Sequence, residues 1–233
     1  MSVGTSENLA AIYECNPIWR SLTEEERQFV VEHGVVRSYE KNEIIHSDGE
    51  TSQYVNVLLS GKVRLYKEGN GQRAQIIRLL KPYDMFGYRA SIADGPYNST
   101  ASALEACRVF RLKKEDFTQL IQTNGAFCYQ IAQLMARALA HSELQTVNLT
   151  QKHIRGRLAE SLLQLKRNYG YEQDGRTLDM LLSREDLANL SNMTTGNAIR
   201  TLSEFQQEGL VAVDGRKIQI LDEESIEKIS RIG

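Results

Sequence analysis

The side chains with the clearest chemistry lie between residues 182 and 210, on two predicted short helices joined by a tight turn. Gly196, Arg200 and Ser203 share the outer face of the second helix, because an apolar stripe occupies the opposite face. An arginine on such a face can donate two hydrogen bonds to one guanine. Two short helices with a small, polar outer face are typical of a helix-turn-helix that enters the major groove of DNA. The alternative is a helical hairpin packed inside an α-helical protein.

Capping residues and buried side chains must position these two helices. Ser183, with Asp186 three residues later, can begin the first helix, and Thr194 or Thr195 can begin the second. The stripe that buries the second helix has the spacing i, i+4, i+7 and consists of Ala198, Leu202 and Phe205.

A β-hairpin is predicted directly after the second helix, because alternating apolar residues flank Asp214-Gly215. This dipeptide favours a type I′ turn, which needs a positive φ at both central residues. A helix-turn-helix followed by a hairpin is a winged helix, and Arg216 and Lys217 at its tip can reach phosphates, although a solvated turn would carry the same residues. The DNA-binding residues expected from the sequence are Arg184, Thr194, Thr195, Gly196, Asn197, Arg200, Arg216 and Lys217.

Length and composition limit the class of protein. The 233 residues, 41% hydrophobic and 25% charged, are ordinary for soluble globular domains, and no apolar run reaches the length of a membrane span. The N-terminal segment lacks the basic region and apolar core of a secretory signal. Cys15, Cys107 and Cys128 are too far apart for a disulfide framework or a zinc site. We therefore expect a protein of the reducing cytoplasm with no membrane partner.

The net charge of -2 argues against DNA binding by bulk electrostatics. No acidic residue lies between Asp186 and Glu204, however, and Arg200 lies inside that interval. Any DNA contact must therefore come from a local stripe. Because such a stripe contacts few phosphates, a dimer is needed to double the contacts.

The first half of the chain predicts a short helix and then β-structure. Residues 21–33 are expected to be helical, with Thr23 and Glu26 as a capping box. Residues 35–112 contain short alternating or apolar runs, which predict a sandwich or barrel of the jelly-roll kind. A short helix is expected at residues 114–122. The turns between the strands are expected at Asp48-Gly49, Ser60-Gly61 and Gly69-Asn70-Gly71.

A long helix is predicted from residue 127 to residue 149, where the chain has neither glycine nor proline. Its apolar residues must be buried against its own β-domain or against the same helix of a second subunit. Its second half is polar, which core packing explains poorly. A polar dimer seam, or a seam that also meets a ligand, explains it better. We expect a homodimer. The expected dimer residues are Ile131, Leu134, Met135, Ala138, Leu139 and Ser142.

Several motifs occur in a fixed order along residues 16–220: DGE at residues 48–50, SGKVRLY, YDMFGY, QLMARAL, RGRLAESLLQL and the helix-turn-helix. In this order the chain resembles the superfamily of the catabolite activator protein and the fumarate-nitrate regulator (CRP/FNR). The resemblance implies an α+β protein with three parts. These are a cyclic-nucleotide-binding-type β-roll, or jelly roll, at residues 1–125, a dimerisation helix at 126–151 and a winged helix-turn-helix at 152–233.

The resemblance implies a homodimeric transcription regulator that binds double-stranded operator DNA and whose β-roll senses a small molecule. Regulators of this kind also contact RNA polymerase, for which residues 169–175 are a candidate. The competing interpretation is a ligand-receptor module whose winged helix contacts another protein. An enzyme is not expected, because the sequence has no nucleophile elbow, P-loop, dinucleotide fingerprint or zinc-protease motif.

The expected effector pocket departs from the family pattern. Cyclic-AMP-binding members hold a glycine-glutamate pair and then an arginine-serine pair, where this sequence has Gly87-Tyr88 and Asn98-Ser99. The ribose-binding glutamate and the phosphate-neutralising arginine are therefore absent, and burying an unpaired anion is costly. Arg89 could swing into the pocket, although adjacent residues often point to opposite faces, and Ser142 would offer a hydroxyl from the long helix. The expected effector-pocket residues are Gly87, Tyr88, Arg89, Asn98, Ser99 and Ser142. We expect an effector other than cyclic AMP, or none.

Two other sensing chemistries of the family fit poorly. Iron–sulfur sensors carry several N-terminal cysteines, and this chain has only Cys15 near its start. Haem needs an axial ligand, and each histidine is more simply an exposed or core residue, with His141 the strongest candidate. The four histidines are His33, His46, His141 and His153.

The recognition helix departs from the family pattern as well. Its members use an arginine, a glutamate and a second arginine to read bases, and these positions hold Thr195, Gly196 and Arg200 here. Direct readout therefore concentrates on Arg200, and we expect a half-site that differs from the usual one. Asn197 can meet adenine or phosphate. Asn192 takes the place of a turn glycine, which asparagine tolerates.

Overall fold

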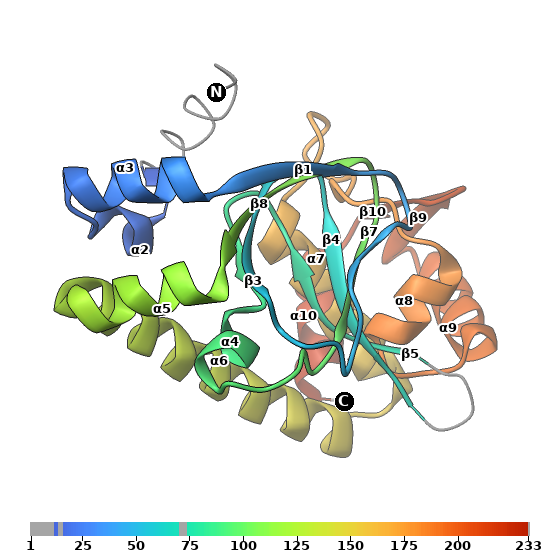
Figure 1. Ribbon diagram of the computed structural model, residues 1–233. Helices are drawn as coiled ribbons and strands as arrows, with labels where there is room; N and C mark the ends of the chain where they lie inside the picture. The colour runs from blue at the N-terminus through green and yellow to red at the C-terminus, as the bar shows by residue number, and fades with distance from the viewer. Residues whose placement is uncertain (1–11, 14–15, 70–73, 233) are drawn as a thin grey trace. The chain divides into compact units, whose positions relative to one another are not determined.

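The computed structural model describes residues 12–13, 16–69 and 74–232, and Figure 1 shows the order of its elements. Short helices come first, strands β1 to β8 follow with further short helices, and a long helix then leads to helices and a two-stranded hairpin. The expected α+β architecture, a β-roll with a long helix and a winged helix-turn-helix, is confirmed. Within the described residues, no helix has both the length and the apolar character needed to cross a membrane.

The chain divides into two compact units. The β-roll unit contains the residues up to 67 and residues 78–140, and the C-terminal unit contains residues 68–77 and 141–233. The long helix α6 (Gly125–Gln151) contributes to both. The domain boundaries expected from the sequence, after residues 125 and 151, stay a prediction.

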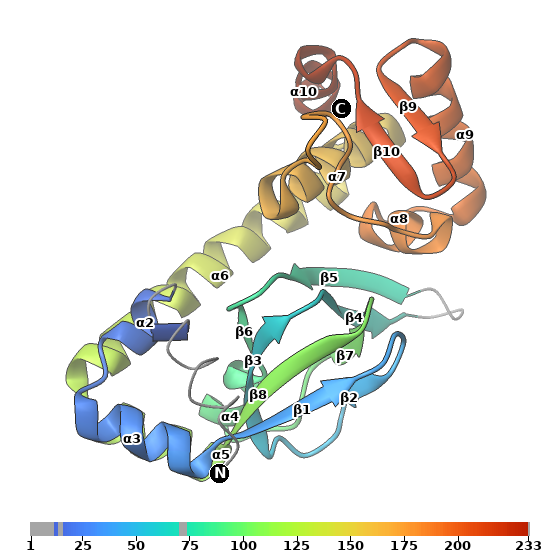
Figure 2. The same cartoon turned by 90° about the horizontal axis from the view of Figure 1, so that it is seen from above.

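Two four-stranded sheets form the β-roll, and their strands are seen in Figure 2. The first sheet has the order β1 (Val35–Tyr39), β8 (Cys107–Lys113), β3 (Tyr54–Ser60) and β6 (Met85–Phe86). The second has the order β2 (Ile44–His46), β7 (Thr100–Ala103), β4 (Val63–Glu68) and β5 (Ala74–Leu80). The strands bury a shared apolar cluster that includes Leu58, Val63, Leu65, Phe86, Ala101 and Val109.

Glycine turns close the roll where the sequence predicts them. Gly49 and Gly61 both have positive φ, at 81° and 85°. Gly61 has a second constraint, because a Cβ there would lie 2.5 Å from the carbonyl oxygen of Ala106. The third expected turn, around Gly71, lies partly outside the described residues.

Helices pack on the first sheet around an aromatic core. Trp19 contacts Phe110 and Phe127, with ring centroids 6.5 and 5.7 Å apart, and Ile131 of α6 belongs to the same buried cluster. Thr23 forms the predicted capping box with Glu26. The helices are α2 (Pro17–Arg20), α3 (Glu24–His33), α4 (Tyr88–Ile92) and α5 (Lys114–Thr123). The short helix α4 was not predicted.

The C-terminal unit is a helical bundle with a hairpin. Its buried side chains include Leu158, Leu162, Leu187, Phe205 and Ile226. Helix α10 was not expected from the sequence. After α6 the elements are α7 (Ile154–Tyr169), α8 (Arg184–Leu190), α9 (Thr195–Gln207), β9 (Val211–Asp214), β10 (Lys217–Ile220) and α10 (Glu223–Ile232).

The first turn of α7 is tied to the ends of both helices of the helix-turn-helix. The Arg155 guanidinium donates hydrogen bonds of 2.8 and 2.7 Å to Glu208, and one of 3.3 Å to Glu204 near the end of α9. Arg157 Nε donates to the carbonyl oxygen of Ser191, just after α8, at 3.2 Å. These contacts connect α7 to α8 and α9 by side chains as well as by packing.

A polar cluster joins α7 to α10 around the carboxylate of Glu160. This carboxylate accepts hydrogen bonds from Ser230 Oγ at 2.6 Å, from Arg167 at 2.6 Å and from Lys152 Nζ at 3.0 Å. Burial raises the pKa of Glu160, but the hydrogen bonds from Ser230, Arg167 and Lys152 outweigh it and lower the pKa to about 2. The folded protein therefore favours the ionised carboxylate.

Glu160→Gln is expected to lower the free energy of unfolding of the C-terminal unit at pH 7 by roughly 1–2 kcal/mol. The folded pKa lies below the ordinary value of 4.5, so the carboxylate stabilises fully above pH 4.5 and loses this effect as the pH falls towards 2. Urea denaturation followed at α7 by pulsed hydrogen exchange should show the difference shrinking between pH 7 and pH 3. Exposed Glu227, changed to Gln, is the control. A difference that does not vary with pH would contradict this role.

Candidate nucleic-acid interface and effector pocket

The helix-turn-helix has the predicted caps and turn. Ser183 Oγ accepts a hydrogen bond from the Asp186 N–H at 3.0 Å at the start of α8. Thr194 Oγ1 accepts one from the Asn197 N–H at 3.2 Å at the start of α9, so Thr194 and not Thr195 is the cap. Asn192 occupies the turn with φ 49°, the left-handed conformation expected for it. The stripe Ala198, Leu202 and Phe205 is buried as predicted.

Helix α9 presents an open, mostly polar face to solvent. Thr195, Gly196 and Arg200 are all exposed, and the Arg200 guanidinium donates a hydrogen bond of 3.1 Å to Asn197 Oδ1. A Cβ at Gly196 would meet no atom within 4 Å, so packing does not require glycine there. The absent side chain instead leaves the backbone accessible to a close partner. Ile199, 46% exposed, adds an apolar group that suits a thymine methyl and that the sequence reasoning missed.

The hairpin forms after α9, but its turn is one residue later than predicted. Asp214 pairs with Lys217, so Gly215 and Arg216 are the central residues of the turn. Gly215 has φ 55°, whereas Arg216 is not among the residues with positive φ. The expected type I′ turn is therefore wrong, and the pattern is that of type II′, with glycine first. The cause is the strand register, which pairs Asp214 within β9.

The basic residues near the hairpin are not equally available. Arg216 is exposed at the tip. Arg184 donates a hydrogen bond of 2.7 Å to the carbonyl oxygen of Gly215, which fixes the hairpin against the start of α8. Lys217 Nζ lies 2.8 Å from Glu172, so a carboxylate already offsets the charge expected to meet phosphate. That ion pair raises the pKa of Lys217.

The expected effector residues do meet in the β-roll. Gly87, Tyr88, Arg89, Asn98 and Ser99 all line one cavity of about 20 Å³. Arg89, expected in the pocket although its neighbour Tyr88 could have pointed the other way, lines the cavity, because α4 places both residues there. Ser142 lies outside the β-roll unit, and its role stays a prediction. The remaining lining residues are His46, Leu65, Arg78, Phe86, Ala90 and Tyr97.

Aromatic side chains nearly close this cavity. The rings of His46 and Tyr97 stack with centroids 3.8 Å apart and planes 15° from parallel, and Tyr97 donates a hydrogen bond of 2.8 Å to the Tyr54 carbonyl oxygen. Burial lowers the pKa of His46 to about 4, so its ring is neutral. The Tyr88 hydroxyl is buried and finds no hydrogen-bond partner among the described residues. The space left admits about one water molecule, far less than a nucleotide needs.

The sequence did not indicate the roles of His46, Arg78 and Tyr97. His46 is one of four histidines, and its neighbours in the sequence do not distinguish it from the others. Arg78 is held by Asp84, with 3.4 Å between Nη2 and Oδ1. Tyr97 and His46 are far apart in the chain, so no local pattern shows that their rings meet. Within the described residues, no group of three His, Cys, Asp or Glu side chains can hold a metal ion, and Cys15 lies outside them.

Helix α6 separates the expected dimer residues into two groups. Met135 and Leu139 are 38% and 63% exposed, and Ser142 is exposed as well. Ile131, by contrast, is 3% exposed inside the core of its own chain, and Leu134 packs partly against that core. The expectation that Ile131 contacts a second subunit is therefore wrong, because its own β-roll unit already covers it.

Two domain families match the chain in the same order as its units. The cyclic nucleotide-binding domain family matches residues 36–124, and the Crp-like helix-turn-helix domain family matches residues 156–229. The CRP-like cAMP-activated global transcriptional regulator of Mycobacterium tuberculosis is 24% identical over 196 residues, which are 83% of this chain and 87% of that protein. The cyclic AMP receptor protein of Thermus thermophilus is 26% identical over 215 residues, 92% of this chain and 97% of that protein.

Solved structures agree with these matches. FixK2 from Bradyrhizobium japonicum has a TM-score of 0.75 and 25% identity, and the alignment covers 84% of this chain and 96% of that one. A CRP-family transcriptional regulator from Thermus thermophilus shares the fold, with a TM-score of 0.71, 22% identity and coverage of 84% and 96%. The matched families lie in the order roll, then helix-turn-helix, and together account for most of the described residues. The chain therefore belongs to the CRP/FNR superfamily of DNA-binding transcription regulators.

Proposed function

We propose that this regulator acts as a homodimer that reads a near-palindromic operator through α9 and responds to a small molecule other than cyclic AMP. The observation that carries the proposal is the open outer face of α9, where Arg200 stands exposed beside a glycine with no packing role. A guanidinium in this position has the geometry for bidentate readout of guanine.

Dimerisation is supported by the side chains that α6 leaves exposed. Met135, Leu139 and Ser142 follow one another at intervals of four and three residues, the spacing of a coiled-coil seam. Within the described residues, Met135 and Leu139 stay 38% and 63% exposed on this face. A second α6 running alongside would bury them, and it would bring two recognition helices to one operator.

The size and the lining of the pocket at Tyr88 support the proposal that the effector is not cyclic AMP. The cavity at Tyr88 and Asn98 holds about 20 Å³, too little for a nucleotide, and of the two arginines that line it, Arg78 is already paired with Asp84. Titration calorimetry with cyclic AMP is expected to show no saturable heat up to millimolar nucleotide. The cyclic AMP receptor protein of Thermus thermophilus serves as the positive control. Binding at micromolar concentration would overturn this part of the proposal.

A salt titration separates DNA binding from the competing interpretation, in which the winged helix contacts protein. The mobility shift of a promoter fragment should weaken steeply as salt rises from about 50 to 200 mM, because bound counterions are released from phosphates. The ion pair between Lys217 and Glu172 favours the protein-binding interpretation, because it offsets a positive charge that was expected to meet phosphate. A chain that shifts no fragment at low salt would favour the protein-binding module.

We also propose that the loop at residues 169–175 contacts RNA polymerase. Gln173, Asp174 and Gly175 are exposed at its tip. The loop is ordered by hydrogen bonds, since Asp174 accepts from the Arg176 and Thr177 N–H groups at 3.0 and 2.8 Å. Transcription in vitro with Gln173→Ala is expected to fall while operator affinity is unchanged.

A further inference from the structure

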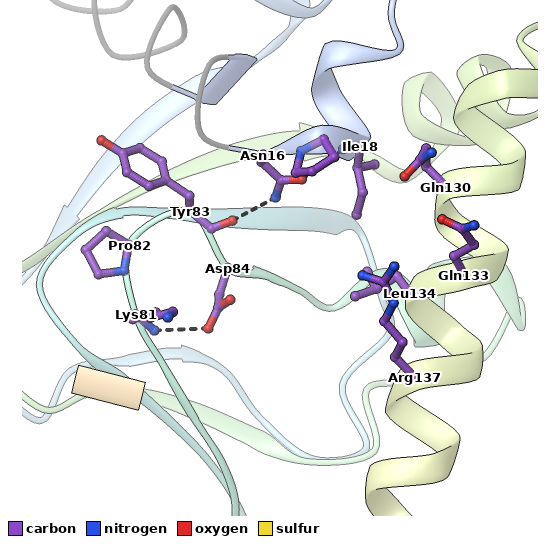
Figure 3. A pocket seen from close by; sticks show the side chains of 11 residues that line it. Asn16, Ile18, Lys81, Pro82, Tyr83, Asp84, Gln130, Gln133, Leu134 and Arg137 are labelled. Atoms are coloured by element: carbon purple, nitrogen blue, oxygen red, sulfur yellow. Dashed lines mark hydrogen bonds between the residues drawn. The ribbon is translucent and has the colours of Figure 1, made fainter. Parts of the chain in front are cut away.

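A second cavity in the β-roll unit is much larger than the pocket at Tyr88. It has a volume of about 510 Å³, within the range of small-molecule sites. Three segments enclose it, as Figure 3 shows: the start of α2, the turn between β5 and β6, and one face of α6. We call it the α6 groove. It is lined by Asn16, Pro17, Ile18, Lys81, Pro82, Tyr83, Asp84, Gln130, Gln133, Leu134 and Arg137.

The polar lining of the α6 groove favours an anion. Lys81 and Arg137 enter it from the turn and from α6, and among the described residues no carboxylate lies within salt-bridge distance of either side chain. Gln130 and Gln133 add amide donors from successive turns of the helix. Among the described lining residues Asp84 is the one acidic side chain, and its charge is already paired.

Asp84 is held within the β5–β6 turn. One carboxylate oxygen lies 3.4 Å from the Arg78 guanidinium, and the other accepts a hydrogen bond from the Lys81 N–H at 3.1 Å. The Arg78 guanidinium offsets its negative charge, and the backbone hydrogen bond fixes its orientation. Among the described residues, Lys81 Nζ and Arg137 therefore remain as the charges of the groove without a carboxylate partner.

The rest of the groove is mostly apolar, and hydrogen bonds fix the segments that form its wall. Ile18 and Leu134 provide the larger aliphatic surfaces, with two prolines beside them. Asn16 Nδ2 donates a hydrogen bond of 3.0 Å to the carbonyl oxygen of Tyr83, which ties α2 to the turn. Tyr83 holds φ 72°, a conformation that costs a bulky residue energy and persists only where the surrounding structure fixes it.

We propose that the α6 groove binds an amphipathic organic anion, a small aromatic ring or short chain with one carboxylate, sulfonate or phosphate group. The anionic group would lie between Lys81 and Arg137, and the apolar body would lie on Ile18 and Leu134. Such a ligand bridges the β5–β6 turn and α6. On the helix, Gln130, Gln133 and Arg137 point roughly opposite to the seam of Met135, Leu139 and Ser142, so ligand and partner subunit do not compete.

The probe for this site is 8-anilinonaphthalene-1-sulfonate, a fluorescent anion of the proposed class. We expect saturable binding of one probe per chain. Arg137→Gln and Lys81→Gln should each weaken it about tenfold, because each removes one of the two positive charges that attract the anion. Gln133→Trp, which fills the groove without removing charge, should abolish it. The matched controls Arg231→Gln and Lys41→Gln change exposed cations elsewhere and should leave affinity unchanged.

Competition experiments show which kind of anionic group the α6 groove binds. Displacement of the probe by benzoate indicates a carboxylate ligand, and displacement by phenyl phosphate indicates a phosphate ligand; either supports the site. No saturable probe binding, or binding that all three groove variants leave intact, overturns the proposal. Because none of these measurements involves DNA, a failure of the groove is distinguishable from a failure of operator binding.

Discussion

Leu139→Asp is expected to convert the protein to a monomer and to lower operator affinity at least a hundredfold. Leu139 is 63% exposed in the single chain and lies at the centre of the proposed seam, so a two-fold axis would bring two aspartates close together. Burying two uncompensated carboxylates is costly, and the dimer would lose that free energy. A monomer carries one recognition helix and half the phosphate contacts, so it also loses the gain from binding two half-sites at once.

Light scattering after size-exclusion chromatography measures the mass, and fluorescence anisotropy with an operator fragment measures the affinity. Ala140→Asp is the matched control, since it places the same charge on an exposed neighbour that faces away from the seam. We expect Ala140→Asp to remain dimeric. If Leu139→Asp stayed dimeric at micromolar concentration, the subunits would have to meet elsewhere.

Arg200→Ala is expected to cost about 1–3 kcal/mol per half-site and to remove the preference for one guanine. The effect is large because few other side chains can contact bases. The two neighbouring positions that could do so are Thr195 and Gly196, and glycine has no side chain. Asn197 Oδ1 accepts a hydrogen bond from the guanidinium at 3.1 Å and so helps to orient it on the outer face. Binding to unrelated DNA should change little.

Selection of bound sequences from a random pool, repeated with the variant, measures this preference position by position. Ser203→Ala tests the same face of α9 without a charge, since Ser203 donates its hydroxyl hydrogen to the Ile199 carbonyl oxygen at 2.9 Å. It should leave the preference intact. An Arg200→Ala protein that binds every sequence equally more weakly would instead identify Arg200 as a phosphate contact.

The features that the sequence predicts well are those set by neighbouring residues. The caps at Thr23, Ser183 and Thr194 formed as expected, because each depends on a side chain and a backbone N–H three residues later. The left-handed Asn192 is a local property of the same kind. The hairpin after α9 was also found, but its turn shifted by one residue, because pairing between the strands decides the register.

The parts that could not be predicted depend on residues distant in the chain. His46 and Tyr97 stack only because the roll brings their segments together, and the resulting closure of the effector pocket has no sequence signal. Helix α4 is a five-residue segment, too short for helical periodicity to show. Ile131 fits a dimer stripe by spacing, and only the packing of Trp19 and Phe127 shows that its place is in the core.

The side-chain ties at the start of α7 have a mechanical consequence. Arg155 donates hydrogen bonds to Glu208 at the end of α9, and Arg157 donates one to Ser191 at the end of α8. We therefore expect α9 to move with the first turn of α7 as one body. Between this body and α6 lie only two non-helical residues, Lys152 and His153. Lys152 is itself tied to α7, since its Nζ donates a hydrogen bond of 3.0 Å to Glu160 and its carbonyl oxygen accepts one of 3.1 Å from Arg157. Any displacement of α7 would then be passed directly to α9, and the reading surface itself would keep its shape.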